Sequence, residues 1–216
     1  MWGTGINPKW QKTIPGNLTI HAVRGLRTLE VLKSKNVVPT EEKETRVSIG
    51  DPGTALIHLF PSFQWESNGV PCFVPHHQDQ ELFEQNQRRS VHLETNIRMI
   101  SVRDSWRNVV QELSRCSSIA SSSLHGLVIA DALGIPSRWF QYAGSRTEKT
   151  EGWFKYQDYF STIGRVDAMP LGDIEELLNV ENNYWSPPDQ SDLSWLIHHI
   201  ETSFPFDLFE VHNQGT

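Results

Sequence analysis

The stretch Ile119-Ala-Ser-Ser-Ser-Leu-His-Gly-Leu-Val-Ile-Ala-Asp-Ala-Leu-Gly-Ile-Pro136 decides the fold. The apolar character of residues 115–120 predicts a short buried strand, which three serines then interrupt. Residues 124–133 have the length and apolar pattern of a buried helix, and Gly134 and Pro136 end it. A strand, a small-residue turn and a helix in this order are typical of a parallel α/β sheet.

The turn between the strand and the helix contains residues that could take part in binding or catalysis. Ser121, Ser122 and Ser123 can satisfy the free amide groups at the start of the helix, and those same amides can bind an anion. His125 falls in the first helical turn, beside whatever the turn holds. Serine turns are also common helix caps, and a histidine beside one is often structural. The residues of this turn therefore leave both interpretations open.

Two motifs resemble those of a known family. The stretch from Ala120 to Pro136 resembles the signature of the polysaccharide pyruvyl transferases, in the branch that modifies bacterial exopolysaccharides. Trp153-Phe-Lys-Tyr-Gln-Asp-Tyr-Phe-Ser-Thr-Ile-Gly-Arg165 is similar to the element Phe-Lys-x-x-Asp-Tyr-x-x-Ser-x-Gly-Arg of the same family. Weaker matches occur at Ala22–Thr28 and at Gly50–Gly53, and the resemblance extends to Phe209.

The resemblance implies an α/β fold like that of the GT-B glycosyltransferases, with two Rossmann-like units and parallel sheets. We expect a partial first unit over residues 1–68, a second unit over 69–170 that carries Ser-Ser-Ser-Leu-His-Gly, and C-terminal helices and a tail over 171–216. The family has Trp-Gly-[Ser/Thr]-Gly well inside its first unit. Trp2-Gly-Thr-Gly-Ile6 therefore resembles a family member that lacks its amino-terminal segment, and exposed apolar surface is expected near Trp2 and Ile6.

Strands and helices alternate along most of the chain. Strands are predicted over residues 18–23, 46–49, 70–74, 96–101 and 138–142, and helices over 26–33, 81–89, 104–114, 172–178 and 192–202. Asp51, followed by Pro52, is predicted to cap the short helix after the second strand. In the helix over 104–114, Trp106, Val109 and Leu113 are predicted to face inward, with Val110.

The family's reaction, if this chain performs it, transfers the enolpyruvyl carbons of phosphoenolpyruvate to a sugar as a cyclic ketal and releases phosphate. The resemblance implies His125 as the general acid that protonates carbon 3. Arg24 follows a predicted strand, where ligands of open α/β sheets bind, and is expected to bind the anionic donor. The other expected donor ligands are Ser121, Ser122, Ser123 and Lys155; without the family match, Arg24 would be an ordinary surface arginine.

Three further residues are candidates for the cleft. His76 and His77 follow a predicted strand in a Pro-His element that the family shares, and Asp158 lies three residues after Lys155. A Lys155–Asp158 pair is either an exposed helical pair or a phosphate-binding lysine oriented by its carboxylate. No metal is expected, since adjacent histidine side chains diverge and no third ligand is apparent. No cofactor is expected either, because phosphoenolpyruvate is a substrate.

Composition excludes several classes of protein. A formal charge of −7 argues against nonspecific binding to nucleic acid. No apolar run approaches the roughly 20 residues that span a bilayer, and the first residues do not resemble a signal peptide. Cys72 and Cys116 are predicted to be reduced thiols of a cytoplasmic protein. A saccharide acceptor can be lipid-linked, which would hold the protein at the inner face of the membrane.

Two other functions remain open from the sequence. One is a non-catalytic homologue that binds a sugar or a partner subunit, which the expected loss of the amino-terminal segment motivates. The other is a glycosyltransferase that uses a sugar nucleotide, because a fold does not determine chemistry. The sequence lacks a recognisable ribose-binding acid after a glycine-rich turn, and it indicates neither the acceptor sugar nor an oligomeric state.

Overall fold

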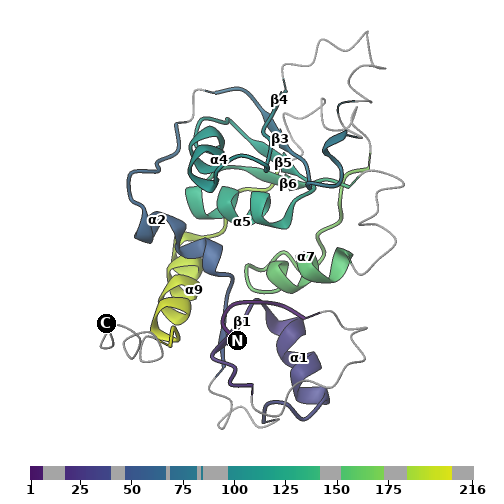
Figure 1. Ribbon diagram of the computed structural model, residues 1–216, viewed down its shortest axis with the longest axis vertical. Coiled ribbons are helices and arrows are strands. Elements are labelled where there is room, and N and C mark those ends of the chain that lie inside the picture. Colours follow the sequence, from purple (N-terminus) through teal and green to yellow (C-terminus); the bar gives the residue numbers. More distant parts are fainter. Residues whose placement is uncertain are drawn as a thin grey trace, which may run out of the picture.

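The computed structural model describes residues 1–6, 18–39, 47–66, 69–81, 84, 97–141, 152–172 and 184–205 (Figure 1). These residues form a mixed α/β structure with two parallel sheets, as predicted. Residues 173–178 of the predicted helix over 172–178, and most of the predicted helix over 81–89, fall outside the described residues. No helix among the described residues is long and apolar enough to cross a membrane.

The larger sheet contains four parallel strands in the order β4-β3-β5-β6. Their bounds are β3 Cys72–Val74, β4 Arg98–Met99, β5 Ile119–Ser121 and β6 Ser137–Trp139. Helix α4 (Trp106–Leu113) connects β4 to β5, and α5 (Leu124–Leu133) connects β5 to β6. Both helices pack against the same strands in a core of aliphatic side chains. The chain first moves from β3 to one neighbour and then returns to the other side, so the strand order reverses between β3 and β5.

Helix α5 is the buried centre of this unit. It has the predicted bounds, and eight of its ten residues are buried. It ends at Gly134, whose φ of 75° lies in the left-handed region that glycine adopts without strain. At its start, a Cβ on Gly126 would lie 2.3 Å from the Ser121 hydroxyl oxygen, so only glycine allows the serine turn to fold back on the helix.

The smaller sheet pairs β1 (Ala22–Val23) with β2 (Ser48–Ile49) in parallel, and Thr4 forms a parallel bridge to Val23. Helix α1 (Leu26–Ser34) follows β1, and the short 3₁₀ helix η1 (Pro52–Ala55) and α2 (Leu56–Leu59) follow β2. The predicted cap is confirmed, because the Asp51 carboxylate accepts a hydrogen bond from the Gly53 amide at 2.9 Å.

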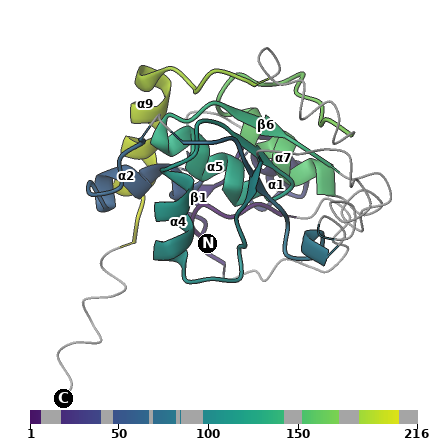
Figure 2. The same ribbon diagram turned by 90° about the horizontal axis from the view of Figure 1, so that it is seen from above.

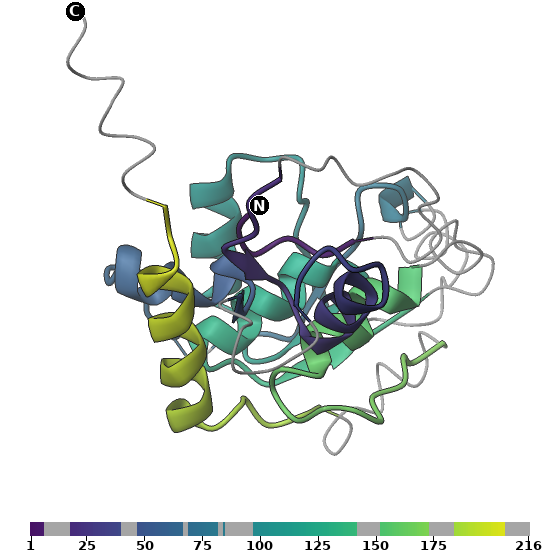
Figure 3. The ribbon, with the colours of Figure 1, turned by 90° about the horizontal axis from the view of Figure 1, so that it is seen from below.

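Two later helices tie the smaller sheet to the larger one. Helix α7 (Gly152–Phe160) lies beside α1, which Figures 1 and 3 show from two sides. A Cβ on Gly25 would lie 1.9 Å from the Asp158 carbonyl oxygen, so this approach depends on glycine. Helix α9 (Gln190–Thr202) runs beside α2 (Figure 2) and packs Leu193 and Ile197 against Ala55.

Helix α9 also covers the first residues of the chain. The Trp2 indole donates a hydrogen bond to the Ile200 carbonyl oxygen at 3.0 Å, and its ring meets Phe204 edge to face. Trp2 and Ile6 are both half-buried. The structure therefore shows neither full packing of these two side chains nor the predicted exposed apolar surface.

Two predictions from local sequence are wrong. Trp106 is 46% exposed and does not face inward, because it packs against Phe60 at the surface, at a ring distance of 4.8 Å. Cys72 and Cys116 are not free thiols but form a disulfide, with a Cα–Cα distance of 5.7 Å. Cys72 begins β3 and Cys116 lies just before the neighbouring strand β5, so the parallel sheet joins residues 44 positions apart. Because the two cysteines are bonded to each other, they do not support the prediction of reduced thiols in a cytoplasmic protein.

Candidate functional site

The candidate site lies at the carboxyl ends of β3 and β5, between which the strand order reverses. Open α/β sheets bind their ligands in the crevice at such a point. His76 follows β3 and Ser122 follows β5, and the His76 amide donates a hydrogen bond to the Ser122 hydroxyl oxygen at 2.9 Å. The two strand ends are thus joined directly, and the sequence-predicted histidines and serines lie together.

The serine turn is held largely by its own hydroxyl groups. Ser121 donates to the Val74 carbonyl oxygen at 2.8 Å, and Ser122 donates to the Asp79 carboxylate at 3.0 Å; both serines are buried. Tyr156 donates to the Ser122 carbonyl oxygen at 2.6 Å. Ser123 directly precedes α5, but its side chain does not cap the helix. A ligand at this turn would therefore meet Ser123 and the first amides of α5, while Ser121 and Ser122 shape the turn.

His125 projects from the first turn of α5 and is exposed to solvent over 67% of its side chain. Its Nε2 atom lies 3.9 Å from an Asp51 carboxylate oxygen, a distance that suits an ion pair when the ring is protonated. A histidine this exposed contributes little to the core.

Asp51 is a site residue that the sequence reasoning missed. One carboxylate oxygen caps η1, while the other lies 3.3 Å from Arg24 Nε and 3.9 Å from His125 Nε2. Only 4% of its side chain is exposed. Asp51 follows β2 just as Arg24 follows β1, so its place at the same sheet edge was the available signal. Because capping of η1 already accounted for an aspartate at this position, the sequence offered no reason to expect a second contact from its other carboxylate oxygen.

Arg24 is enclosed where β1 ends, with 14% of its side chain exposed. Its contact with Asp51 is an ion pair without hydrogen-bond geometry, so within the described chain the buried Nε donor has no acceptor. A Cβ on Gly5 would lie 2.8 Å from Arg24 Nη1. The second glycine of Trp-Gly-Thr-Gly thus leaves room for the guanidinium group.

Lys155 reaches the same region from α7 and is half-buried. Burial and the positive charge of Arg24 lower its pKa, while the negative charge of Asp79 opposes this shift. The Lys155 Nζ atom lies 5.1 Å from the centre of the Tyr156 ring, whose hydroxyl group contacts the serine turn. Lys155 therefore adds a positive charge to the side of the molecule that holds this turn.

Lys155 is not paired with Asp158. The Asp158 carboxylate accepts hydrogen bonds from the Thr28 amide at 2.8 Å and from the Thr28 hydroxyl at 2.6 Å, and it is fully buried. Burial raises the pKa of Asp158, and the two Thr28 hydrogen bonds oppose this. Asp158 faces α1 and positions α7, which in turn carries Lys155.

The adjacent histidines differ in their surroundings. His76 is half-buried and His77 is exposed, with 4.2 Å between their rings. Burial, reinforced by the charges of Lys155 and His77 and opposed by Asp79, lowers the pKa of His76 from 6.5 to about 4. The Gln78 amide donates to His76 Nδ1 at 3.4 Å, so we assign the ring proton of neutral His76 to Nε2. Among the described residues, no three potential ligands could hold a metal ion.

The lowered pKa of His76 predicts how stability depends on pH. Unfolded His76 gains a proton near pH 6.5, whereas the folded protein keeps it neutral down to about pH 4, so acidification between these values favours unfolding. We expect His76→Gln to lose less stability than the parent protein over this range. Denaturant unfolding at pH 7, 5.5 and 4.5 measures the difference, with His198→Gln on α9 as the control. Equal acid slopes for the parent and His76→Gln would contradict the assignment.

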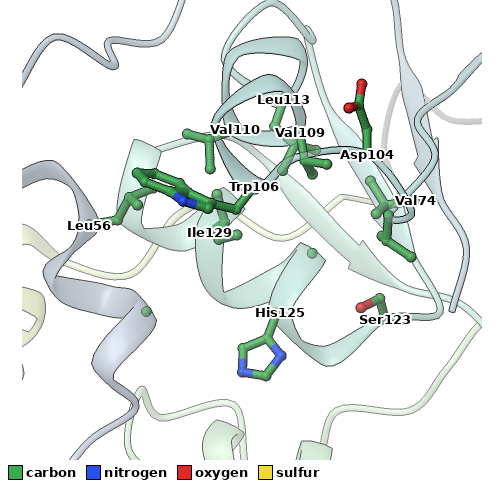
Figure 4. Close-up of a pocket in the computed structure, with 13 residues that line it drawn as sticks. Leu56, Val74, Asp104, Trp106, Val109, Val110, Leu113, Ser123, His125 and Ile129 are labelled. Atoms are coloured by element: carbon green, nitrogen blue, oxygen red, sulfur yellow. The ribbon is translucent and has the colours of Figure 1, made fainter. Parts of the chain in front are cut away.

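A cavity of about 400 Å³ opens beside His125, as Figure 4 shows. It lies between α4, α5 and the η1–α2 segment, with Ser123 and Gly126 also in its wall. The candidate site thus has two parts: a charged part around Arg24, Asp51 and Lys155, and an apolar part on the side of α4. His125 borders both.

His76 and the serine turn lie at the reversal point of the larger sheet, the place where open α/β sheets bind their ligands. The chain belongs to the polysaccharide pyruvyl transferase family, whose family model matches residues 1–144. The matched residues include Arg24, Asp51 and His125, and they end before α7, which carries Lys155.

One relative and one negative result complete the comparisons. The chain is 29% identical over 153 residues to the uncharacterized protein L143 of Acanthamoeba polyphaga mimivirus. The aligned region covers 67% of this chain and 48% of that protein, so the chain spans about half the length of this relative. No solved structure matches the chain.

Proposed function

We propose that this protein transfers the pyruvyl group of phosphoenolpyruvate to two neighbouring hydroxyl groups of a saccharide, free or lipid-linked, and releases phosphate. The observation that carries the proposal is that Arg24 and His125 both meet the buried Asp51 carboxylate, at 3.3 Å and 3.9 Å, while the charges of Lys155 and Arg24 influence each other. Membership of the polysaccharide pyruvyl transferase family supports the same reaction.

The donor would be held by charge. Phosphoenolpyruvate carries a carboxylate and a phosphate, and charge-assisted hydrogen bonds from arginine and lysine are strong ligands for both groups. Arg24 offers a guanidinium group whose buried Nε lacks an acceptor among the described residues. Lys155 adds a second positive charge, and the first amides of α5 add the positive end of a helix. Binding an anion here would relieve the repulsion between Arg24 and Lys155.

In the proposed reaction, His125 donates a proton to carbon 3 of the donor, so that positive charge develops at carbon 2. One saccharide hydroxyl attacks carbon 2 and loses its proton, and the carbon–oxygen bond to phosphate breaks. The neighbouring hydroxyl then attacks carbon 2 and closes the ketal ring. The products are a pyruvate ketal and inorganic phosphate. Of the two protons lost by the hydroxyl groups, one replaces the proton that His125 gave to carbon 3, and the other leaves with the phosphate as hydrogen phosphate.

Two further side chains support these steps. Asp51 lies between Arg24 and His125, where its carboxylate can orient both the guanidinium group and the imidazole ring. Neutral His76, with its proton assigned to Nε2, can donate a hydrogen bond to a substrate oxygen without adding charge.

The proposed architecture is that of a GT-B-like protein. Parallel strands of both sheets end near the same group of residues: Arg24 follows β1, Asp51 follows β2 and His76 follows β3. This arrangement supports a division into a first unit over residues 1–68, a second over 69–170 and a C-terminal part over 171–216. Helices α7 and α9 pack back onto the first unit and would hold the two units together.

The role of Arg24 predicts a loss of donor affinity. Arg24→Ala removes a charge-assisted hydrogen bond, which is worth about 1.5–3 kcal/mol, so phosphoenolpyruvate should bind roughly 10-fold to 150-fold more weakly. Isothermal titration calorimetry measures this change. Arg115→Ala, which removes a surface arginine paired with Glu112, is the matched control and should bind the donor as the parent does. Unchanged affinity in folded Arg24→Ala would refute the assignment.

The activity itself is tested by incubating the full chain with phosphoenolpyruvate and a panel of pyranosides. We expect phosphate release that depends on the acceptor, together with a saccharide product whose mass includes a pyruvate ketal. Phosphate release that is equal with and without acceptor would indicate hydrolysis of the donor and would contradict the proposed transfer.

A further inference from the structure

The cavity beside His125 is apolar over most of its wall. Its volume is about 400 Å³, within the range of small-molecule sites. Aliphatic and aromatic side chains from α2, α4, α5 and the neighbouring strand ends line it: Leu56, Val74, Val102, Trp106, Val109, Val110, Leu113 and Ile129. His125 and Ser123 lie on one side of the cavity and Trp106 on another (Figure 4).

Few polar groups are available to an occupant. The polar side chains of the wall are Asp104, Ser123 and His125. The Asp104 carboxylate already accepts hydrogen bonds from the Ser105 amide at 2.6 Å and from the Asn108 side chain at 3.2 Å. A sugar ring enclosed here would leave most of its hydroxyl groups without partners, which disfavours binding. An apolar group suits this wall better than a second sugar does.

We propose that the cavity binds an apolar aglycone, an alkyl or aryl group joined to the sugar that reacts at His125. The inference rests on the proposed function, because it places the acceptor sugar at His125. An acceptor of this kind has a polar sugar at one end and an apolar group at the other, and the cavity likewise has a polar end and an apolar end. The polar end lies at His125 and Ser123, and the apolar end lies against α4.

Trp106 forms the part of the wall that is open to solvent. It is 46% exposed, and its position is held by Phe60 at 4.8 Å and by the Arg107 guanidinium group 4.5 Å from its ring centre. An exposed tryptophan supported in this way offers a large apolar surface with little loss of side-chain freedom on binding. It is therefore the residue whose removal should weaken the aglycone contact while the core remains intact.

The test compares methyl and phenyl glycosides of glucose, galactose and mannose as acceptors for the full chain. Burying one additional apolar group in an enzyme pocket changes kcat/KM by about 10-fold or more. We expect the phenyl glycoside of the accepted sugar to exceed the methyl glycoside by at least this factor. Trp106→Ala should reduce the preference to about 3-fold or less, through a fall in kcat/KM for the phenyl glycoside. Trp195→Ala, which removes a similarly exposed tryptophan on α9, should keep the full preference.

Each outcome decides the proposal. Equal kcat/KM for the two glycosides in the parent protein would overturn the aglycone site and leave the proposed function intact. If no acceptor supports phosphate release, the proposed function fails, and saturation-transfer NMR with phenyl glycosides then tests the cavity alone. Phenyl signals that depend on Trp106 would support the site, whereas their absence, or their persistence in Trp106→Ala, would overturn it.

Discussion

Replacing His125 with alanine is expected to lower turnover by roughly 10²-fold to 10⁴-fold, the usual contribution of a general acid. The fold should tolerate this change, because the His125 side chain is 67% exposed and its one ion-pair partner among the described residues is Asp51. Donor affinity should also be largely retained, since in the proposed site Arg24 and Lys155, and not His125, would provide the charges that hold phosphoenolpyruvate.

Thermal unfolding, donor binding and turnover measured on one preparation distinguish a catalytic from a structural histidine. If His125 has a structural role, the His125→Ala variant should be less stable, and its activity should fall only in proportion to the fraction of protein that is unfolded. His198→Ala, an exposed histidine on α9, is the control and should retain full activity. Turnover in His125→Ala within about threefold of the parent would remove His125 from the mechanism.

Replacing Arg165 with alanine is expected to destabilise the protein by about 3–5 kcal/mol, the usual effect of breaking a buried ion pair from one side. Both Asp131 carboxylate oxygens accept hydrogen bonds from the Arg165 guanidinium group at 2.9 Å. Tyr159 donates a third hydrogen bond to Asp131 at 2.9 Å, and Asp131 is fully buried. Burial raises the pKa of Asp131 and Arg165 opposes that shift, so the variant would drive this carboxyl toward its protonated form.

Urea unfolding measures the free energy of unfolding for Arg165→Ala. A double variant with Asp131→Leu and Arg165→Met removes both charges and should recover much of the loss, because no unpaired buried charge remains. The contact joins α5 to the segment after α7, and hence the two motifs that the sequence analysis singled out. If Arg165→Ala lowers the free energy of unfolding by less than about 1 kcal/mol, the ion pair does not hold α5 to the segment after α7.

Features governed by neighbouring residues were predictable from the sequence. The bounds of α5 follow from a continuous apolar run that ends at Gly134, and the Asp51 cap follows from its place before Pro52. Parallel sheets follow from the alternation of strands and helices. For the helix and the cap, the physical cause lies within a few residues along the chain, and for the sheets it lies in the order of the elements.

Contacts between distant residues were not predictable in the same way. The Cys72–Cys116 disulfide and the Asp51–His125 contact depend on which strands become neighbours, and spacing along the chain does not reveal this. Trp106 occupies a helical position typical of a core residue, yet Phe60 meets it at the surface. Lys155 and Asp158 are close in sequence but face different partners, because Thr28 engages the carboxylate.

The most direct test of the proposed transfer is an NMR spectrum of the saccharide product formed in deuterated water. Protonation of carbon 3 by the enzyme would place one deuteron in the ketal methyl group, while the remaining two hydrogens come from the donor. We predict a pyruvate ketal on the saccharide whose methyl group carries one deuterium. An unmodified saccharide accompanied by free pyruvate and phosphate would contradict the account.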